Sequence, residues 1–357
     1  MSLDKCREIR QHGPALLFRA SRHIAKGMHA MKILVTGGAG YIGSHTCKAL
    51  ALAGHEPVVY DNLSSGHRKL VRWGDFVHGD IRDTAALAGA MRAHAVDGVI
   101  HFAALADVGQ SVGDPEIYYS VNVAGSLSVL RAMRQAGVQH IVVSGSYSVH
   151  GQPDGIPIRE DLPLLPQNPY ARTKVVMEQM LADFGHAYGL RGAVLRYANA
   201  AGDDADGDCG ELHNPENHLI PRLLMAAAGR IPALRIFGDD YATEDGTCVR
   251  DYIHVTDLAE AHVSALAHLA AHDGPLVLNL GSGSGYSVKS IINEAETVLG
   301  RKIPHEWASR RPGDPAWLVA DPAKAKAVIG WQARHSSLAN ILATAAAWHA
   351  RAGFGGD

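Results

Sequence analysis

From residue 31 onward, short apolar runs alternate with longer stretches in which apolar residues recur every three or four positions. Several of the runs are apolar at consecutive positions, which is typical of parallel strands covered by helices on both faces. The longer stretches predict helices that make right-handed crossovers between the strands. The pattern therefore predicts an α/β fold with a doubly wound, parallel, Rossmann-type sheet. The predicted strands are Lys32–Thr36, Glu56–Asp61, Asp75–Gly79, Gly98–Ala103, His140–Ser144 and Gly192–Tyr197, and the predicted helices are Ser44–Ala53, Asp83–His94, Val123–Ala136 and Tyr170–Tyr188.

The pattern changes after Asn199, where Asp and Gly residues without periodicity predict a loop. We expect a smaller C-terminal substrate-binding lobe here, with a helix at Leu219–Gly229 and a strand at Ala233–Phe237. Asp257 is the expected N-cap of a long helix that follows a strand entry at Tyr252. The expected organisation is an N-terminal extension (1–30), a Rossmann-type domain (31–199, with 252–280 returning to it) and the smaller lobe (200–251 and 281–350).

Residues 1–30 carry several arginines among apolar residues. This composition fits an amphipathic targeting or partner helix, or an upstream extension before a start at Met31. We favour the extension, because Asp4 and Glu8 are unusual in a transit peptide and no apolar core of a secretory signal is present.

Composition narrows the class of protein. A formal net charge of −3 over 357 residues gives no electrostatic reason to expect nucleic acid or a membrane surface as partner. The four scattered cysteines (Cys6, Cys47, Cys209, Cys248) favour a reducing cytoplasm over a disulfide framework. The 21 histidines show no HExxH or comparable paired spacing, so no metal site is expected.

The segment from Leu34 to Ser44 joins a predicted strand to a predicted helix through Gly37, Gly40 and Gly43. Glycines there permit a tight turn and a close approach of the backbone to a pyrophosphate, which the helix N-terminus attracts. Asp61 ends the next strand, where a carboxylate binds the adenosine ribose and repels a 2′-phosphate. These features predict NAD as the cofactor.

Tyr170 and Lys174 lie one turn apart on a predicted helix. The lysine is expected to lower the pKa of the tyrosine, so that Tyr170 serves as a base near neutral pH. Ser146 follows the predicted strand His140–Ser144 and is expected to share a substrate hydroxyl with Tyr170. The catalytic residues predicted from this arrangement are Ser146, Tyr170 and Lys174.

Together with the segment TEDGTCVRDYIH at Thr243–His254, these motifs resemble the extended short-chain dehydrogenase/reductase family, most of all its UDP-glucose (UDP-galactose) 4-epimerases. The resemblance runs from about Met31 to Trp331. It implies hydride removal to NAD, rotation of a 4-keto sugar and hydride return. It also implies a homodimer in which the helices Val123–Ala136 and Tyr170–Tyr188 form a bundle.

The resemblance also assigns binding roles. Those implied for NAD are Gly37, Gly40, Tyr41, Ile42, Gly43, Asp61, Asn62, Asp80, Ile81, Phe102, Ala103, Ala104, Asn122, Ser144, Tyr170, Lys174 and Tyr197. Those implied for the UDP-sugar are Ser146, Tyr170, Asn199, His218, Leu219, Arg235, Phe237, Arg250, Arg311 and Asp314.

Several positions near the expected sugar site depart from the family pattern, among them Tyr147, His150 and Ala198. If the strands that end near Ser146 and Tyr197 are neighbours, Tyr147 is expected to fill the volume that Ala198 vacates. Leu318 aligns with the position that helps to set the volume available beside the sugar in this family. A leucine is of intermediate size, so it does not decide whether an N-acetyl group fits.

Three other functions stay open on these residues. The first is a UDP-pentose or UDP-N-acetylhexosamine 4-epimerase, and the second a decarboxylase acting on a glucuronate nucleotide. The third is a catalytically idle NAD-binding sensor or scaffold. A 4,6-dehydratase is disfavoured because Tyr147-Ser148 replaces the Asp-Glu pair that it requires.

Overall fold

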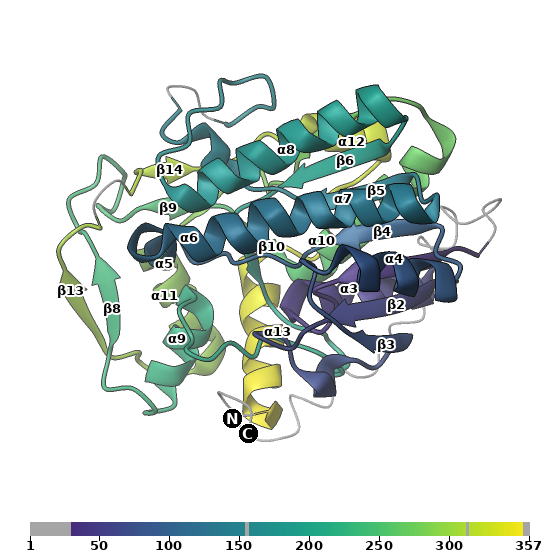
Figure 1. The fold of residues 1–357 in the computed structure, drawn as a ribbon. Coiled ribbons are helices and arrows are strands. Elements are labelled where there is room, and N and C mark those ends of the chain that lie inside the picture. Colours follow the sequence, from purple (N-terminus) through teal and green to yellow (C-terminus); the bar gives the residue numbers. More distant parts are fainter. Residues whose placement is uncertain (1–29, 154–156, 312–313, 353–357) are drawn as a thin grey trace.

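The computed structural model describes residues 30–153, 157–311 and 314–352, so Cys6 and the expected extension lie outside the described residues (Figure 1). A seven-stranded parallel sheet is its centre, in the order β11-β6-β5-β4-β1-β2-β3. The chain order reverses between β1 and β4, as in a doubly wound sheet. The strands are β1 (Lys32–Thr36), β2 (Glu56–Asp61), β3 (Asp75–His78), β4 (Gly98–His101), β5 (His140–Ser144), β6 (Arg191–Arg196) and β11 (Leu276–Asn279).

Helices cover both faces of this sheet. One face packs on α3 (Tyr41–Leu52) and α10 (Val255–Ala271), which contact one another. The other face packs on α4 (Thr84–Ala93), α7 (Gly125–Ala136) and α8 (Pro169–Tyr188). Alternate residues of β1 supply the two cores: Ile33 lies in the first and Leu34 in the second, because successive side chains of a strand point to opposite faces. Both cores are fully buried at these positions.

The predicted fold class is correct. Strands β1, β2 and β5 have the predicted bounds, and the others differ by one or two residues. One prediction is wrong: Asp257 is not the N-cap of α10, because the cap is His254, whose ring nitrogen accepts from the Thr256 amide. Asp257 lies buried in the first turn, where its carboxylate accepts hydrogen bonds from the amides of Arg334 and His335.

Short helices on the α8 side are α5 (Val108–Gly113), α6 (Pro115–Tyr118), the π-helical turn η4 (Tyr119–Ala124) and η5 (Tyr147–His150), whereas Leu70 of η3 (Arg68–Leu70) packs against Leu212 and Trp348. Figure 1 shows α6 running into α7, which lies beside α8 in front of the sheet. No helix among the described residues is long and apolar enough to cross a membrane.

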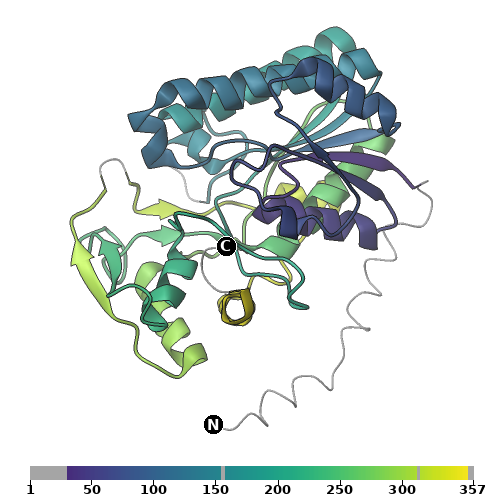
Figure 2. The same ribbon diagram turned by 60° about the horizontal axis from the view of Figure 1, so that its bottom comes forward.

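The later part of the chain forms a smaller lobe beside the sheet (Figure 2, green and yellow). Its core joins α9, α11 and α13 through buried residues such as Leu223, Ile291 and Ile341. Its helices are α9 (Leu219–Ala227), α11 (Val288–Leu299) and α13 (Leu338–Ala352), whereas α12 (Ala323–Ile329) packs against α10 and β11. The small sheets are β7 (Asn199–Ala201) with β10 (Tyr252–His254), β8 (Leu234–Phe237) with β13 (His305–Ala308), and β9 (Val249–Arg250) between β12 (Tyr286–Ser287) and β14 (Trp317–Leu318).

A lysine joins the lobe to the part of the chain that forms the central sheet. Lys48 of α3 donates hydrogen bonds to Asp204 (2.8 Å), Asp206 (2.8 Å) and Asp208 (3.1 Å) of the loop after β7. The side chains of Lys48 and Asp204 are 12% and 10% exposed, so the surrounding chain largely shields this ion pair from water, whereas Asp206 is mostly exposed.

Candidate active site

A cleft of about 620 Å³ opens at the carboxyl ends of β1, β4, β5 and β6. This edge, at the point where the strand order reverses, is where doubly wound sheets bind ligands. The cleft is lined by most of the residues predicted for cofactor and substrate: Gly37, Gly40, Tyr41, Ile42, Gly43, Asp61, Asn62, Asp80, Ile81, Phe102, Ala103, Ala104, Ser144, Ser146, Tyr170, Lys174, Tyr197, Asn199, His218 and Arg250.

The glycine loop between β1 and α3 is packed too closely for side chains. Gly37 has φ +72°, and a Cβ there would lie 2.7 Å from the backbone nitrogen of Ala103. A Cβ on Gly43 would lie 2.2 Å from the carbonyl oxygen of Gly37. The loop therefore brings bare backbone and the N-terminus of α3 to the cleft, which fits the pyrophosphate of a dinucleotide.

Asp61 closes this end of the cleft. Its carboxylate accepts hydrogen bonds from the amides of Ala39 (3.0 Å) and Leu63 (2.8 Å), and burial raises its pKa. Asp80 lies beside it on the cleft, and hydrogen bonds from Arg82 lower the pKa of Asp80 to about 2. These fixed carboxylates suit hydroxyl and amino groups of an adenosine and disfavour an added phosphate.

Ser146 and Tyr170 meet in the middle of the cleft. Ser146 follows β5 and is the N-cap of η5, while Tyr170 lies in the first turn of α8, which Asn168 caps. Burial raises the pKa of Tyr170, and a hydrogen bond with Ser146 opposes that shift. The expected lowering of this pKa by Lys174 stays a prediction, because the two resolved influences on it are burial and Ser146.

Lys174 lies one turn further along α8, buried, with its ammonium 5.9 Å from the centre of the Tyr170 ring. The ammonium donates to the carbonyl oxygen of Ser144 (2.8 Å), and the Ser144 hydroxyl bonds the Tyr197 hydroxyl (2.7 Å). Burial lowers the pKa of Lys174 to about 8, while Glu178 on the next turn raises it. Lys174 is thus a cation whose charge is poised near neutral pH.

Asn122 is buried beneath the cleft and does not line it. Its side chain exchanges hydrogen bonds with the backbone of Leu105 and donates to Thr173 (3.1 Å). In this position it fixes the loop that follows β4, and its predicted contact with the cofactor stays a prediction.

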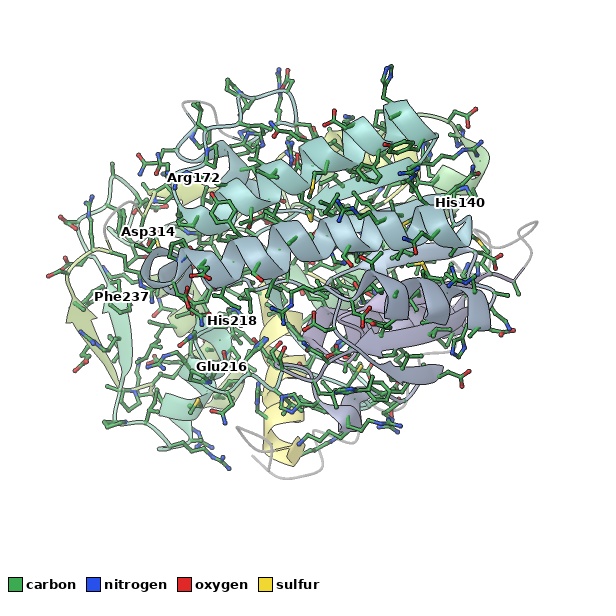
Figure 3. All side chains as sticks on the ribbon, viewed as in Figure 1. His140, Arg172, Glu216, His218, Phe237 and Asp314 are labelled. Atoms are coloured by element: carbon green, nitrogen blue, oxygen red, sulfur yellow. The ribbon has the colours of Figure 1, made fainter. Side chains whose placement is uncertain are left out.

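The residues predicted for uridine (Leu219, Arg235, Phe237 and Asp314) lie outside the lining of this cleft, as does Arg311, which was predicted for the diphosphate. Phe237 has the guanidinium of Arg311 at 4.1 Å and that of Arg235 at 5.5 Å from its ring centre. Figure 3 shows Phe237 and Asp314 on the smaller lobe. The structure therefore gathers these residues on the lobe but does not join them to the cleft.

Arg250 connects the cleft to that group. Its guanidinium is paired with Asp314 (2.5 Å) and donates to the carbonyl oxygens of Val249 (2.7 Å) and Pro315 (2.7 Å). These bonds orient the cation, which is the requirement for bidentate binding of a diphosphate.

The hypothesis on Tyr147 and Ala198 is confirmed. Strands β5 and β6 are neighbours, and Tyr147 shares a buried cluster with Ala198 and Leu318. The Tyr147 hydroxyl donates to the carbonyl oxygen of Leu280, which ties this cluster to the end of β11. His150, which also departs from the family pattern, accepts from Arg196 (3.1 Å) next to the buried ion pair Arg196–Glu178 (2.6 Å).

Several lining residues were not predicted, among them Arg82, His213 and the loop residues 64–66. The position of Arg82 could have been predicted from the sequence, because it stands two residues after Asp80, just beyond the end of a predicted strand. The position of His213 could not, since this residue enters the cleft from an aperiodic loop whose path depends on the tertiary structure.

Comparison with known proteins adds independent findings. The sequence model of the NAD dependent epimerase/dehydratase family matches residues 33–281. A UDP-glucose 4-epimerase from Rhizobium leguminosarum bv. trifolii is 48% identical over 319 residues, which cover 89% of this chain and 97% of the relative.

Two solved structures are also similar. A UDP-glucose 4-epimerase from Brucella ovis in complex with NAD has a TM-score of 0.87 and 53% identity, covering 89% of this chain and 98% of the other. A UDP-glucose-4-epimerase from Stenotrophomonas maltophila, with bound NAD and formylated UDP-arabinopyranose, has a TM-score of 0.87 and 43% identity, covering 90% and 98%.

Proposed function

The chain belongs to the NAD dependent epimerase/dehydratase family, and from this premise we propose that it is an NAD-dependent 4-epimerase of a UDP-sugar of the UDP-glucose type. One observation carries the proposal. Ser146, Tyr170 and Lys174 open onto the same cleft as the glycine loop and Asp61. A proton acceptor and a dinucleotide cradle therefore share one space, as hydride chemistry on a bound sugar requires.

The residues present fit NAD. The close packing at Gly37 and Gly43 leaves room for a pyrophosphate only because no side chain is there, and Asp61 stands where the ribose hydroxyls arrive. When bound, NAD accepts a hydride from the sugar and gives it back. Lys174, held by Ser144, is the residue that fixes the nicotinamide end and its ribose in this proposal.

Tyr170 is the proposed acid and base. The phenolate of Tyr170 takes the proton from the sugar 4-hydroxyl, and Ser146 holds that hydroxyl by a hydrogen bond during the transfer. The ammonium of Lys174 at 5.9 Å favours the tyrosinate. After the resulting 4-keto sugar has turned, C4 regains the hydride on its other face, and Tyr170 returns the proton to the 4-oxygen.

The substrate is bound mainly by its nucleotide. Arg250, which lines the cleft, and Arg311 are the proposed cationic contacts of the diphosphate, and Asn199 and His218 assist them. Leu219, Arg235, Phe237 and Asp314 form the proposed uridine site on the lobe. Firm binding of this end allows the sugar to turn without leaving.

A second candidate is a UDP-pentose as substrate. Tyr147 and Leu318 both line the sugar end of the cleft and pack in one cluster, so the wall there is bulky. The relative from Stenotrophomonas maltophila holds a UDP-arabinopyranose derivative. A pentose lacks the C6 hydroxymethyl group and needs less room.

The test is a panel of UDP-glucose, UDP-galactose, their N-acetyl forms and UDP-pentoses, assayed for 4-epimer formation without added NAD. We expect turnover of UDP-glucose and UDP-galactose by the protein as purified. No turnover of any UDP-sugar, with or without added NAD, would exclude the epimerase and favour a sensor or scaffold. Preferred turnover of pentoses would instead support the second candidate.

We further propose a cytoplasmic homodimer. Its interface is expected on α7 and α8, which lie side by side. Near their C-terminal ends, the guanidinium carbon of Arg134 lies 3.7 Å from the centre of the exposed Tyr188 ring. Light scattering of the purified protein tests this, since a monomer at micromolar concentration would contradict it.

A further inference from the structure

Four metal-binding side chains converge in the loop before α9, beside the cleft. They are Glu211, His213, Glu216 and His218, and one ligand atom of each lies within 4.8 Å of all the others. Nδ1 of His213 donates to Glu211 Oε1 (2.9 Å), and Nδ1 of His218 donates to the same oxygen. Nδ1 of His218 is also 3.6 Å from Glu216 Oε1. Figure 3 shows Glu216 and His218 close together above α9.

This place gathers more negative charge than it neutralises with permanent cations. Glu211 and Asp203 are buried (3% and 1% exposed), and Asp203 accepts from the Glu211 amide (2.6 Å). The carboxylates of Glu211 and Glu216 both face Nδ1 of His218. The ion pairs of Glu211 and Glu216 within the described ranges are with histidines. A bound dication would relieve this repulsion.

The donor set identifies the class of ion. Two imidazole nitrogens with two carboxylates suit zinc and its neighbours, whereas calcium and magnesium prefer oxygen alone. Bonds of about 2.0–2.2 Å to a tetrahedral ion place ligand atoms about 3.3–3.6 Å apart, so small side-chain movements suffice. A cavity of about 90 Å³ adjoins the group and is lined by Glu211, His213 and Glu216.

We propose that Glu211, His213, Glu216 and His218 form a binding site for one divalent transition-metal ion of the zinc class. No metal site was expected from the sequence, because the spacing E-x-H-x-x-E-x-H is not a known metal-binding pattern. The four side chains converge only through the folded path of the loop. His213 and His218 also line the cleft, so an ion held by their Nδ1 atoms would fix the wall next to the bound substrate.

Two other acidic groups of the described chain do not qualify. Asp204, Asp206 and Asp208 already share the ammonium of Lys48. Asp257, grouped with Glu260 and His335, uses both carboxylate oxygens for backbone amides and the Ser336 hydroxyl.

The test uses the full chain with its cofactor, stripped of metal by a chelator and dialysed. Isothermal titration with Zn²⁺ is expected to give one saturable site per chain, and Co²⁺ is expected to give the visible bands of a four-coordinate ion. In the variant His213→Ala/Glu216→Gln we expect the affinity to fall by more than the ~10- to 100-fold typical of losing an outer-shell partner.

A matched control is His268→Ala/His272→Ala, which removes two stacked surface imidazoles (4.1 Å apart) on α10. It should keep the same stoichiometry and affinity as the original chain. Absence of saturable Zn²⁺ and Co²⁺ binding, or equal affinity in the His213→Ala/Glu216→Gln variant, would overturn the proposal. If that variant does not fold, ¹⁵N-histidine NMR of the unaltered chain decides, since Zn²⁺ must then move two Nδ1 resonances. Epimerase activity enters none of these readouts.

Discussion

The ammonium of Lys174 donates a 2.8 Å hydrogen bond to the carbonyl oxygen of Ser144, the last residue of β5. The bond links the helix that carries Tyr170 to the strand that leads to Ser146. The distance between base and serine is thus set by a contact between their supporting elements. Substitutions of Tyr170, Lys174 and Ser146 therefore probe the base, the contact that positions it and its hydrogen-bond partner, respectively.

Tyr170→Phe removes the proton acceptor and keeps the ring. We expect turnover of UDP-galactose to fall about 100- to 10,000-fold, the usual contribution of a positioned acid–base group, while bound NAD is retained. Product chromatography and the absorbance of released cofactor measure the two effects. Tyr188→Phe, at the exposed end of the same helix, is the control and should be as active as the unaltered enzyme. Equal activity in both variants would contradict the role of Tyr170.

The pH dependence of turnover should report Lys174. Its pKa of about 8 lies below the ordinary value, so the ammonium is present below pH 8 and is lost as the pH rises through it. We expect an alkaline fall of kcat near that value. Glu178→Gln removes the negative charge that raises this pKa, so the fall should move to lower pH. A profile that does not move, recorded below the unfolding temperature, would show that another group sets it.

Gly37→Ala should release NAD. The added Cβ would lie 2.7 Å from the Ala103 nitrogen, and the φ of +72° strains any side chain by about 1–2 kcal/mol. Gly54→Ala separates these effects, because Gly54 also has a positive φ (+87°) but no atom within 4 Å of its Cβ. We expect Gly54→Ala to lower Tm slightly and keep NAD, whereas Gly37→Ala is purified without it. Equal NAD content in the two variants would refute the close-packing argument.

The buried pair Arg196–Glu178 should behave as a unit. The two side chains are 4% and 8% exposed, so Arg196→Met alone leaves a buried carboxylate and is expected to cost about 3–5 kcal/mol of unfolding free energy. Arg196→Met/Glu178→Leu should recover much of that loss, because no charge is then left unpaired. Urea unfolding measures both, and a double variant no more stable than the single one would disprove the coupling.

The sequence predicted the central sheet well because its signals are local. Apolar runs and glycines mark β1 and the turn after it, and Tyr170 and Lys174 need only helical spacing to come together. The site residues on the smaller lobe were harder to place. Phe237 and Arg311 meet through β8 and the segment after β13, a contact that no local pattern encodes. The shift of the Tyr170 pKa also escaped prediction, since burial is a property of the whole fold.

Lys48 has a consequence for how the molecule opens. It stands on the helix that begins at the glycine loop, and its three aspartates precede Glu211 and His218. Local opening of that loop must break these bonds together, so the loop and α3 belong to one cooperative unit. Amide hydrogens of residues 203–210 should therefore exchange with solvent in step with those of α3. Filling the dinucleotide site would then slow exchange in a segment that lies outside it.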